Sequence, residues 1–339
     1  ALSLLSILAA CQNDENPSQP EPKPRQDINL TRAEQEFMDK GTDFAFRFFD
    51  QVCSTEKEKP NVFVSPLSAS LCLSMITNGA TDNTLAEMQN VLGFPANTFS
   101  LDDLNNYNQK LTSALLDLDN TTQLGIANSI WIEEGFKVYD SFVDVNKKMY
   151  DAQVQELDFT SPTAKDVINQ WCATQTNNCI KEVIQEIPAD ARMYLINALY
   201  FKGIWKSQFD KSATGQDNFT NVDGSQQKVA MMNQTATFNY TQTDDFSIAE
   251  LPYGNEAFSM VILLPSGDKT LDESLPNLNY ENWKQWSKNM VGKELQIKLP
   301  RFKVEYDKEL EEDMIAMGMK DAFDAYKAKF ANMSDAELY

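Results

Sequence analysis

The side chains of this sequence that could do chemistry are 50 carboxylates, five thiols and many hydroxyls, but there is no imidazole. Without histidine the chain has no Ser-His-Asp triad, no Cys-His pair, no His-ligated zinc and no histidine acid or base. Two carboxylates could hydrolyse a glycan, yet among 50 acids some pair always has suitable spacing. The sequence also has no P-loop, no GxGxxG after a strand and no CxxC. These observations favour a protein that is not an enzyme and that uses no metal or cofactor.

One thiol lies in the sequence pattern of a lipid attachment site. Residues Ala1 to Ala10 are apolar or small and lead through Leu8-Ala9-Ala10 into Cys11, as in a lipobox. A run this short cannot span a bilayer, which takes about 20 residues, but it fits the apolar region of a signal peptide. The alternative is a buried helix containing Cys11, but residues 12–25 are polar and hold four prolines, which a core element does not tolerate.

We therefore predict cleavage before Cys11 and acylation of its thiol, with residues 11–28 as a Pro-rich tether. The protein then works outside the cytoplasm, anchored by lipid to a bacterial envelope. The acidic Asp14-Glu15 close behind the cysteine favours the outer membrane or the cell surface.

The other four cysteines are too few for a disulfide scaffold. Cys172 and Cys179 would be about 10 Å apart on one continuous helix, which is too far to bridge. A break at Asn177-Asn178 would allow a bond, so this pairing stays open. Cys53 and Cys72 are interpreted as small buried apolar residues.

Length and charge bound the fold and the partners. The 339 residues are 42% hydrophobic and carry a net charge of −21. This composition supports one large α+β unit or two small domains, and the field repels nucleic acid and anionic lipid. No linker after Arg25 separates two domains, which favours the single unit.

Helix starts can be predicted in the first third of the chain. A capping box at Thr31 to Glu34 begins a helix that runs to about Asp50. A short strand is predicted over 61–64, and Ser65-Pro66 then begins a helix that ends at Asn78-Gly79. A second capping box at Thr84 to Glu87 predicts a helix that stops at Gly93.

The run MYLINALYF, residues 193–201, is almost continuously apolar and predicts a strand covered on both faces in the middle of a sheet. Asn197 breaks the run. A buried amide without partners costs about 1–3 kcal/mol, so we expect Asn197 to have specific hydrogen-bond partners. The alternative is that Asn197 faces solvent at a local edge.

The remaining elements follow from alternation and helical periodicity. A helix is predicted over 163–176 and another from Asp307 to Gly318. Strands are predicted over 126–132, 227–232, 237–241, 247–251, 258–264 and 295–299.

These segments, taken in order, resemble the serpin family over about residues 29–339. The resemblance rests on eight motifs in register. They are GTDFAFRFFD (41–50), NVFVSPLSASLCLSM (61–75), NGATDNTLAEMQNVLGF (78–94), IANSIWIEEGF (126–136), INQWCATQTNNCIKEVI (168–184), NALYFKGIWKSQF (197–209), ELPYGNEAFSMVILLPSG (250–267) and LPRFKVEYDKEL (299–310).

The resemblance implies an α+β fold of about nine helices and three β-sheets, held kinetically above its ground state. It implies a suicide inhibitor of serine or cysteine proteases, whose cleaved reactive loop inserts into the central sheet and traps the acyl-enzyme. By the same resemblance Ser65, Pro66, Ser68 and Asn197 form the shutter behind the sheet. Trp205 lies at the breach where the loop enters, and Trp171 lies on a helix that crosses the sheet.

The sequence departs from the family in two places. Asn177-Asn178-Cys179 replaces a stretch where glycine and a basic residue are common. The chain stops at Ala336 to Tyr339, where family members begin the strand that leads into the hinge, and the reactive loop is not in the chain. We therefore expect a fragment, with 1–10 a signal remnant and 29–339 a serpin domain without its last strands, that aggregates or stays partly molten when expressed alone.

Two other functions stay open at this level. A serpin fold without inhibitory function could act as a binding or structural module on the envelope, and the composition of the hinge discriminates this from an inhibitor. A carboxylate-based glycan hydrolase has only the number of acids behind it.

Overall fold

The computed structural model describes residues 21–59, 61–336 and 338. The predicted signal segment, Cys11 and the first part of the predicted tether lie outside the described residues. The described part of the chain forms nine α-helices, α1 (Arg32–Thr55), α2 (Pro66–Thr77), α3 (Asp82–Leu92), α4 (Leu101–Asp117), α5 (Asp140–Tyr150), α6 (Ala164–Gln175), α7 (Leu271–Ser274), α8 (Tyr280–Lys288) and α9 (Glu311–Met317). It also forms eight strands, β1 (Gln123–Glu133), β2 (Gln153–Leu157), β3 (Met193–Lys202), β4 (Gly215–Thr220), β5 (Gln226–Gln242), β6 (Phe246–Pro252), β7 (Ser259–Pro265) and β8 (Val291–Pro300).

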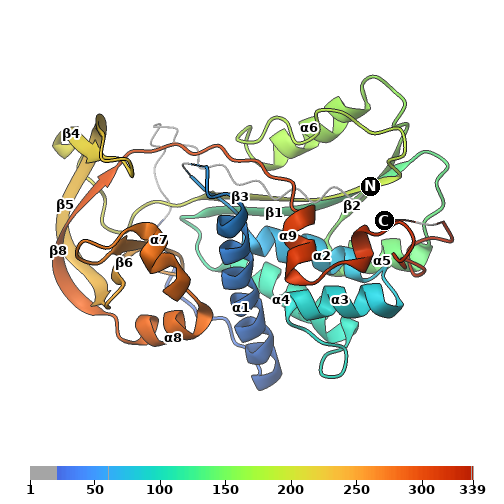
Figure 1. Cartoon of the computed structure of the whole chain (residues 1–339), viewed down its shortest axis with the longest axis horizontal. Coiled ribbons are helices and arrows are strands. Elements are labelled where there is room, and N and C mark those ends of the chain that lie inside the picture. The colour runs from blue at the N-terminus through green and yellow to red at the C-terminus, as the bar shows by residue number, and fades with distance from the viewer. Residues whose placement is uncertain (1–20, 60, 337, 339) are drawn as a thin grey trace.

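The central sheet has the strand order β2-β1-β3, with β1 antiparallel to β3 and parallel to β2. The apolar run of β3 has no polar face, so helices must cover both sides of it. Figure 1 shows α6 above this sheet and α2 to α5 below it. Met193 and Leu195 join the large core that contains α1 and α2, whereas Tyr194 and Ile196 join a smaller core under α6. The predicted strand with two covered faces is confirmed.

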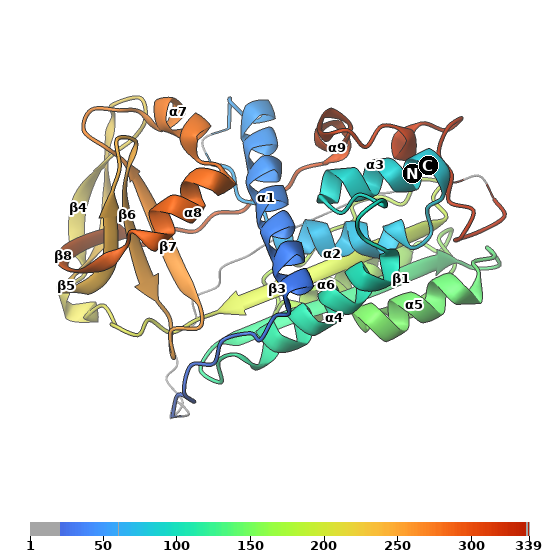
Figure 2. The same cartoon turned by 90° about the horizontal axis from the view of Figure 1, so that it is seen from below.

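The second sheet lies at the other side of α1, which stands between the two regions in both views (Figures 1 and 2). Its strand order is β4-β5-β6-β7, and β8 also pairs with β5. The 17-residue β5 pairs with β4 over 226–231 and with β6 over 239–242. The two strands predicted over 227–232 and 237–241 are therefore one. Because β5 belongs to both pairings, the described residues form two sheets rather than the three expected.

Two of the three helix starts predicted in the first third of the chain are confirmed. Thr31 and Glu34 form the capping box of α1, and Ser65 caps α2 with Pro66 in the first turn. The capping box expected at Thr84 is wrong, because α3 already begins at Asp82. The Thr84 hydroxyl instead accepts the backbone N–H of Lys329, and the Glu87 carboxylate accepts two backbone N–H groups at 320 and 321. Tertiary partners thus take both side chains of the motif.

Two further predictions of local structure are wrong. Residues 61–64 form no strand. The last helix begins at Glu311, four residues after the predicted start. The extended stretch before it carries Lys308, whose ammonium lies 3.0 Å from the Glu56 carboxylate and 3.3 Å from that of the fully buried Asp313. The ion pair between Lys308 and Glu56, the C-cap of α1, holds residues 307–310 in a non-helical conformation before the helix.

The described end of the predicted tether lies against the folded body. The Lys23 N–H donates to Asn120 Oδ1 at 2.8 Å, and the Asn120 amide donates to the carbonyl of Glu21 at 2.9 Å. The Asn255 amide donates to the Lys23 carbonyl at 3.2 Å. Residues 21–23 are therefore held by hydrogen bonds to two turns, so this part of the tether is not a free spacer.

Candidate functional site

The site begins with the first turn of α2, which points at the centre of β3. Ser65 has an extended backbone, and its hydroxyl accepts the Ser68 N–H at 3.2 Å. Pro66 follows in the first turn, where its missing N–H has no helical partner to lose. With its own N–H capped, Ser68 presents its hydroxyl to the sheet and is 1% exposed.

Asn197 lies opposite this hydroxyl and is 3% exposed. Its Oδ1 accepts a hydrogen bond from the Ser68 hydroxyl, and its Nδ2 donates to Asn128 Oδ1 at 2.8 Å. Asn128 is its directly opposed partner across the β1–β3 ladder. Asn197 therefore has the specific partners expected of a buried amide, and the solvent-facing alternative is wrong. The hydroxyl of Ser65, the other expected partner, instead accepts the Ser68 N–H and caps α2.

A second polar link joins α2 to β3. The Cys72 thiol donates to the carbonyl of Leu195 at 3.5 Å, and burial raises the pKa of this thiol to about 12. Cys72 is therefore a neutral buried side chain, as the sequence predicted, rather than a nucleophile. The groups between α2 and β3 thus carry no charge.

The outer edge of β3 is the side away from β1. Within the described residues, β3 pairs with β1 alone. Along this edge, the N–H and C=O groups of every second residue are directed away from β1.

The opposite face of the sheet is covered by α6, which carries Trp171. The Trp171 Nε1–H donates to Gln153 Oε1 at 3.0 Å, and its ring meets Trp131 edge-on with the centroids 6.4 Å apart. Trp171 therefore connects α6 to β2 and β1, across the direction of the strands.

The chain leaves α6 through Asn177 and Asn178, which both have positive φ, 49° and 60°. This left-handed geometry explains how asparagine replaces the glycine common there, since asparagine tolerates it better than most residues. Cys172 is a free buried thiol, so the bond to Cys179 that was left open is not formed.

Trp205 lies beyond the end of β3 and is half-buried, so it is not an ordinary core tryptophan. Its ring stacks on Tyr253 with centroids 4.4 Å apart and planes inclined by 17°, and the two residues form an isolated β-bridge. A Cβ on Gly203 would lie 2.6 Å from the Tyr253 ring, so a glycine is required for this packing. The aromatic stack closes the end of β3 that the sequence assigned to the breach.

Asn128 and its acceptor, the backbone carbonyl of Tyr150 at the end of α5, were not predicted from the sequence. The signal for Asn128 was present, because Asn128 interrupts the apolar strand IANSIWI as Asn197 interrupts MYLINALYF. The acceptor could not be predicted in the same way, because every residue has a backbone carbonyl and the side-chain sequence does not distinguish this one.

The described residues contain neither a metal-binding cluster nor a membrane-spanning helix. No group of three or more Cys, Asp or Glu side chains there could hold a metal ion. None of the described helices is long and apolar enough to cross a membrane.

Comparisons with known proteins agree with this architecture. A family model described as Serpin (serine protease inhibitor) matches residues 39–339. An uncharacterized serpin-like protein of Methanosarcina acetivorans is 34% identical over 302 residues, which cover 87% of this chain and 70% of the relative. Serpin B6 of Macaca fascicularis is 36% identical over 289 residues, covering 82% of this chain and 76% of the relative.

A solved structure gives the same result for the fold. The thermophilic serpin Tengpin in its latent state matches with a TM-score of 0.82 at 31% identity, over 92% of this chain and 82% of that chain. The fold and the matched family define a protein of the serine protease inhibitor class. The chain belongs to the serpin family.

Proposed function

We propose that this protein is a suicide inhibitor of serine or cysteine proteases that traps the acyl-enzyme by inserting a reactive loop beside β3. The observation that carries the proposal is the buried Asn197 amide, which lies in a strand covered on both faces and accepts a hydrogen bond from Ser68 on α2. Asparagine is unfavourable in an apolar strand, so a buried amide there suggests that its hydrogen bonds have a functional role.

In the proposed reaction, the protease nucleophile attacks a peptide carbonyl of the loop and forms an ester or thioester, while the new amine leaves. The cut loop then inserts into the central sheet as a new strand beside β3 before water cleaves the acyl bond. The sheet must shift against α2 during this step. Ser68 and Asn197 can exchange polar partners as it shifts, whereas purely apolar packing would have to break.

The other residues of the site have supporting roles in this proposal. Ser65 and Pro66 fix the first turn of α2, so that the Ser68 hydroxyl stays aimed at the sheet. The Trp205 and Tyr253 stack marks the end where the loop enters. Trp171 holds α6 across the sheet through Gln153 and must release it for a strand to be added.

We propose further that the protein is lipid-anchored outside the cytoplasm through Cys11. The support is the Leu8-Ala9-Ala10-Cys11 pattern and the Pro-rich stretch behind it. Expression of the complete gene product in a bacterial host with radiolabelled palmitate tests the anchor. We expect a labelled protein in the membrane fraction and no label in the Cys11→Ala variant; an unlabelled wild-type protein would rule out the anchor.

Incubation of the complete gene product with a panel of serine and cysteine proteases tests inhibition. We expect a complex that survives a denaturing gel, and a higher melting temperature after the loop is cleaved. The matched control is each protease with its nucleophile chemically blocked, which should form no complex. Absence of any covalent complex, with no gain in melting temperature on cleavage, would instead favour a serpin fold without inhibitory function.

A further inference from the structure

The hydrogen bonds at Asn197 continue beyond Asn128 into α5. The Asn128 Nδ2 donates to the main-chain carbonyl of Tyr150 at 2.7 Å. Tyr150 is the last residue of α5, and Asp151 after it has φ of 51°. The last four carbonyls of a helix have no partner within the helix, so a buried side-chain amide satisfies this one. Ser68, Asn197, Asn128 and the Tyr150 carbonyl thus form a head-to-tail series.

The hydroxyl of the same tyrosine continues the series into α4. It donates to Asn105 Oδ1 at 2.6 Å and accepts from Asn108 Nδ2 at 3.3 Å. The exposed fractions are 6% for Tyr150, 2% for Asn105 and 7% for Asn108. Burial raises the pKa of Tyr150 to about 12, which keeps the hydroxyl a neutral donor.

From α4 the hydrogen bonds return to α2. The Asn105 Nδ2 donates to Asn78 Oδ1 at 2.8 Å, and the Asn78 Nδ2 donates back to Asn105 Oδ1 at 3.1 Å. Asn78 is the C-cap of α2 and also donates to the carbonyl of Ser74 at 3.1 Å. The series therefore leaves α2 at Ser68 and returns to it at Asn78, roughly 15 Å further along the helix axis.

We define the central polar chain as this closed circuit of Ser68, Asn197, Asn128, Tyr150, Asn105 and Asn78. Tyr150 joins its two arms, with its backbone carbonyl in one and its side-chain hydroxyl in the other. Fixing the hydroxyl between Asn105 and Asn108 fixes the end of α5, and with it the carbonyl that orients the Asn128 amide. Each bond in such a series also strengthens its neighbours.

We propose that Tyr150 is a positioning residue for the opening of the central sheet, holding Asn128 and Asn197 in register with both ends of α2. This role rests on the proposed function, because it concerns the step in which the loop is inserted. Without the hydroxyl anchor the end of α5 gains freedom, the Asn128 amide loses its fixed acceptor, and Asn197 changes partners more readily.

The test is hydrogen exchange of the side-chain amides of Asn128 and Asn197, followed by NMR in the complete gene product labelled with ¹⁵N-asparagine. Tyr150→Phe should raise both exchange rates about fivefold, the effect of losing one net hydrogen bond. The matched control is Tyr107→Phe, a buried tyrosine on α4 that stacks on Phe37 with centroids 5.2 Å apart. This control should leave both rates unchanged.

A second variant and a second measurement separate the outcomes. Asn105→Ala removes the acceptor of the Tyr150 hydroxyl and should reproduce the faster exchange, even if Tyr150→Phe folds poorly. Both variants should also convert faster than wild type to the heat-resistant form after loop cleavage. Unchanged exchange, or faster exchange with an unchanged conversion rate, would overturn the proposal. If wild type traps no protease but the exchange accelerates, the amide positioning is supported and the proposed function alone fails.

Discussion

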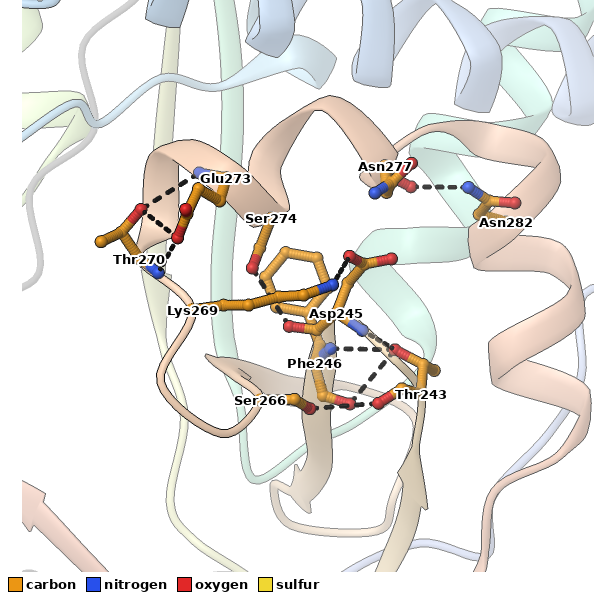
Figure 3. A network of polar contacts seen from close by, with 10 residues as sticks. All are labelled: Thr243, Asp245, Phe246, Ser266, Lys269, Thr270, Glu273, Ser274, Asn277 and Asn282. Carbon is orange, nitrogen blue, oxygen red and sulfur yellow. Dashed lines mark hydrogen bonds and ion pairs between the residues drawn. The ribbon is translucent and has the colours of Figure 1, made fainter.

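The central polar chain joins residues as far as 129 positions apart in the sequence, whereas a second network at the β6–β7 hairpin joins residues at most 29 apart. Figure 3 shows this hairpin network, which we define as Thr243, Asp245, Ser266, Lys269, Thr270, Glu273 and Ser274. It contains an ion pair of Lys269 and Asp245 at 2.8 Å and the capping box of α7. The central chain contains only amides and hydroxyls.

The two networks solve different problems. In the hairpin network, Thr243 accepts the backbone N–H groups of Asp245 and Phe246, and the Ser274 hydroxyl donates to the Asp245 carbonyl at 3.2 Å. These bonds fix one local turn, and the Lys269 side chain stays 41% exposed. Charge is expensive to bury, and the exposure of the Lys269 ammonium limits that cost in the hairpin network. Neutral amides can be buried completely and can exchange hydrogen-bond partners, as the proposed insertion of the loop requires.

The largest predicted effect comes from breaking the central chain at Asn197. Asn197→Ala leaves the Ser68 hydroxyl and Asn128 Oδ1 buried without their partner, and each such group costs about 1–3 kcal/mol. We expect a loss of roughly 2–6 kcal/mol in the free energy of unfolding, measured by denaturant titration, and polymer on size-exclusion chromatography.

The matched control is Asn239→Ala in β5, whose exposed amide donates to Glu250 at 2.8 Å. It should change the stability by less than about 0.5 kcal/mol. Equal losses in the two variants, or unchanged heat resistance and monomer content for Asn197→Ala, would contradict the contrast between the networks.

A smaller effect is expected when the pH is changed, because the stability contributions of the two networks should depend on pH in different ways. The Lys269 ammonium lowers the pKa of Asp245, and the Thr270 N–H lowers that of Glu273. Their contribution is present above the ordinary carboxyl pKa and is lost as the pH falls through the lowered values. The difference in melting temperature between wild type and Lys269→Met should therefore shrink in acid and in high salt.

The central chain should behave in the opposite way. Its one ionisable group, Tyr150, has a pKa raised to about 12 by burial, so its contribution is complete below pH 10 and is lost as the pH rises towards 12. The difference between wild type and Tyr150→Phe should stay constant from pH 5 to 9. An acid-sensitive difference for Tyr150→Phe, or a pH-independent one for Lys269→Met, would show that the networks do not differ in this way.

Motifs whose partners are close in sequence were predicted correctly from the sequence. Thr31 and Glu34 cap their own helix, and Ser65-Pro66 begins α2, because every group involved lies within one turn. The same four-residue pattern failed at Thr84, where N–H groups of residues 320 to 329 compete for both side chains. Local chemistry is decisive only where no distant donor is better placed.

At the candidate site, the sequence alone determined that residues 193–201 form a strand buried on both faces, because the run is almost continuously apolar. It also determined that Asn197 needs hydrogen-bond partners, because a buried amide without them is unfavourable. Only the tertiary structure decided which residues are the hydrogen-bond partners of Asn197. Asn128 is opposed to Asn197 through the register of β1, and Tyr150 enters the circuit through the end of α5. Register and helix packing are set by the whole core, so the residues that meet are fixed by contacts that no short stretch of sequence contains.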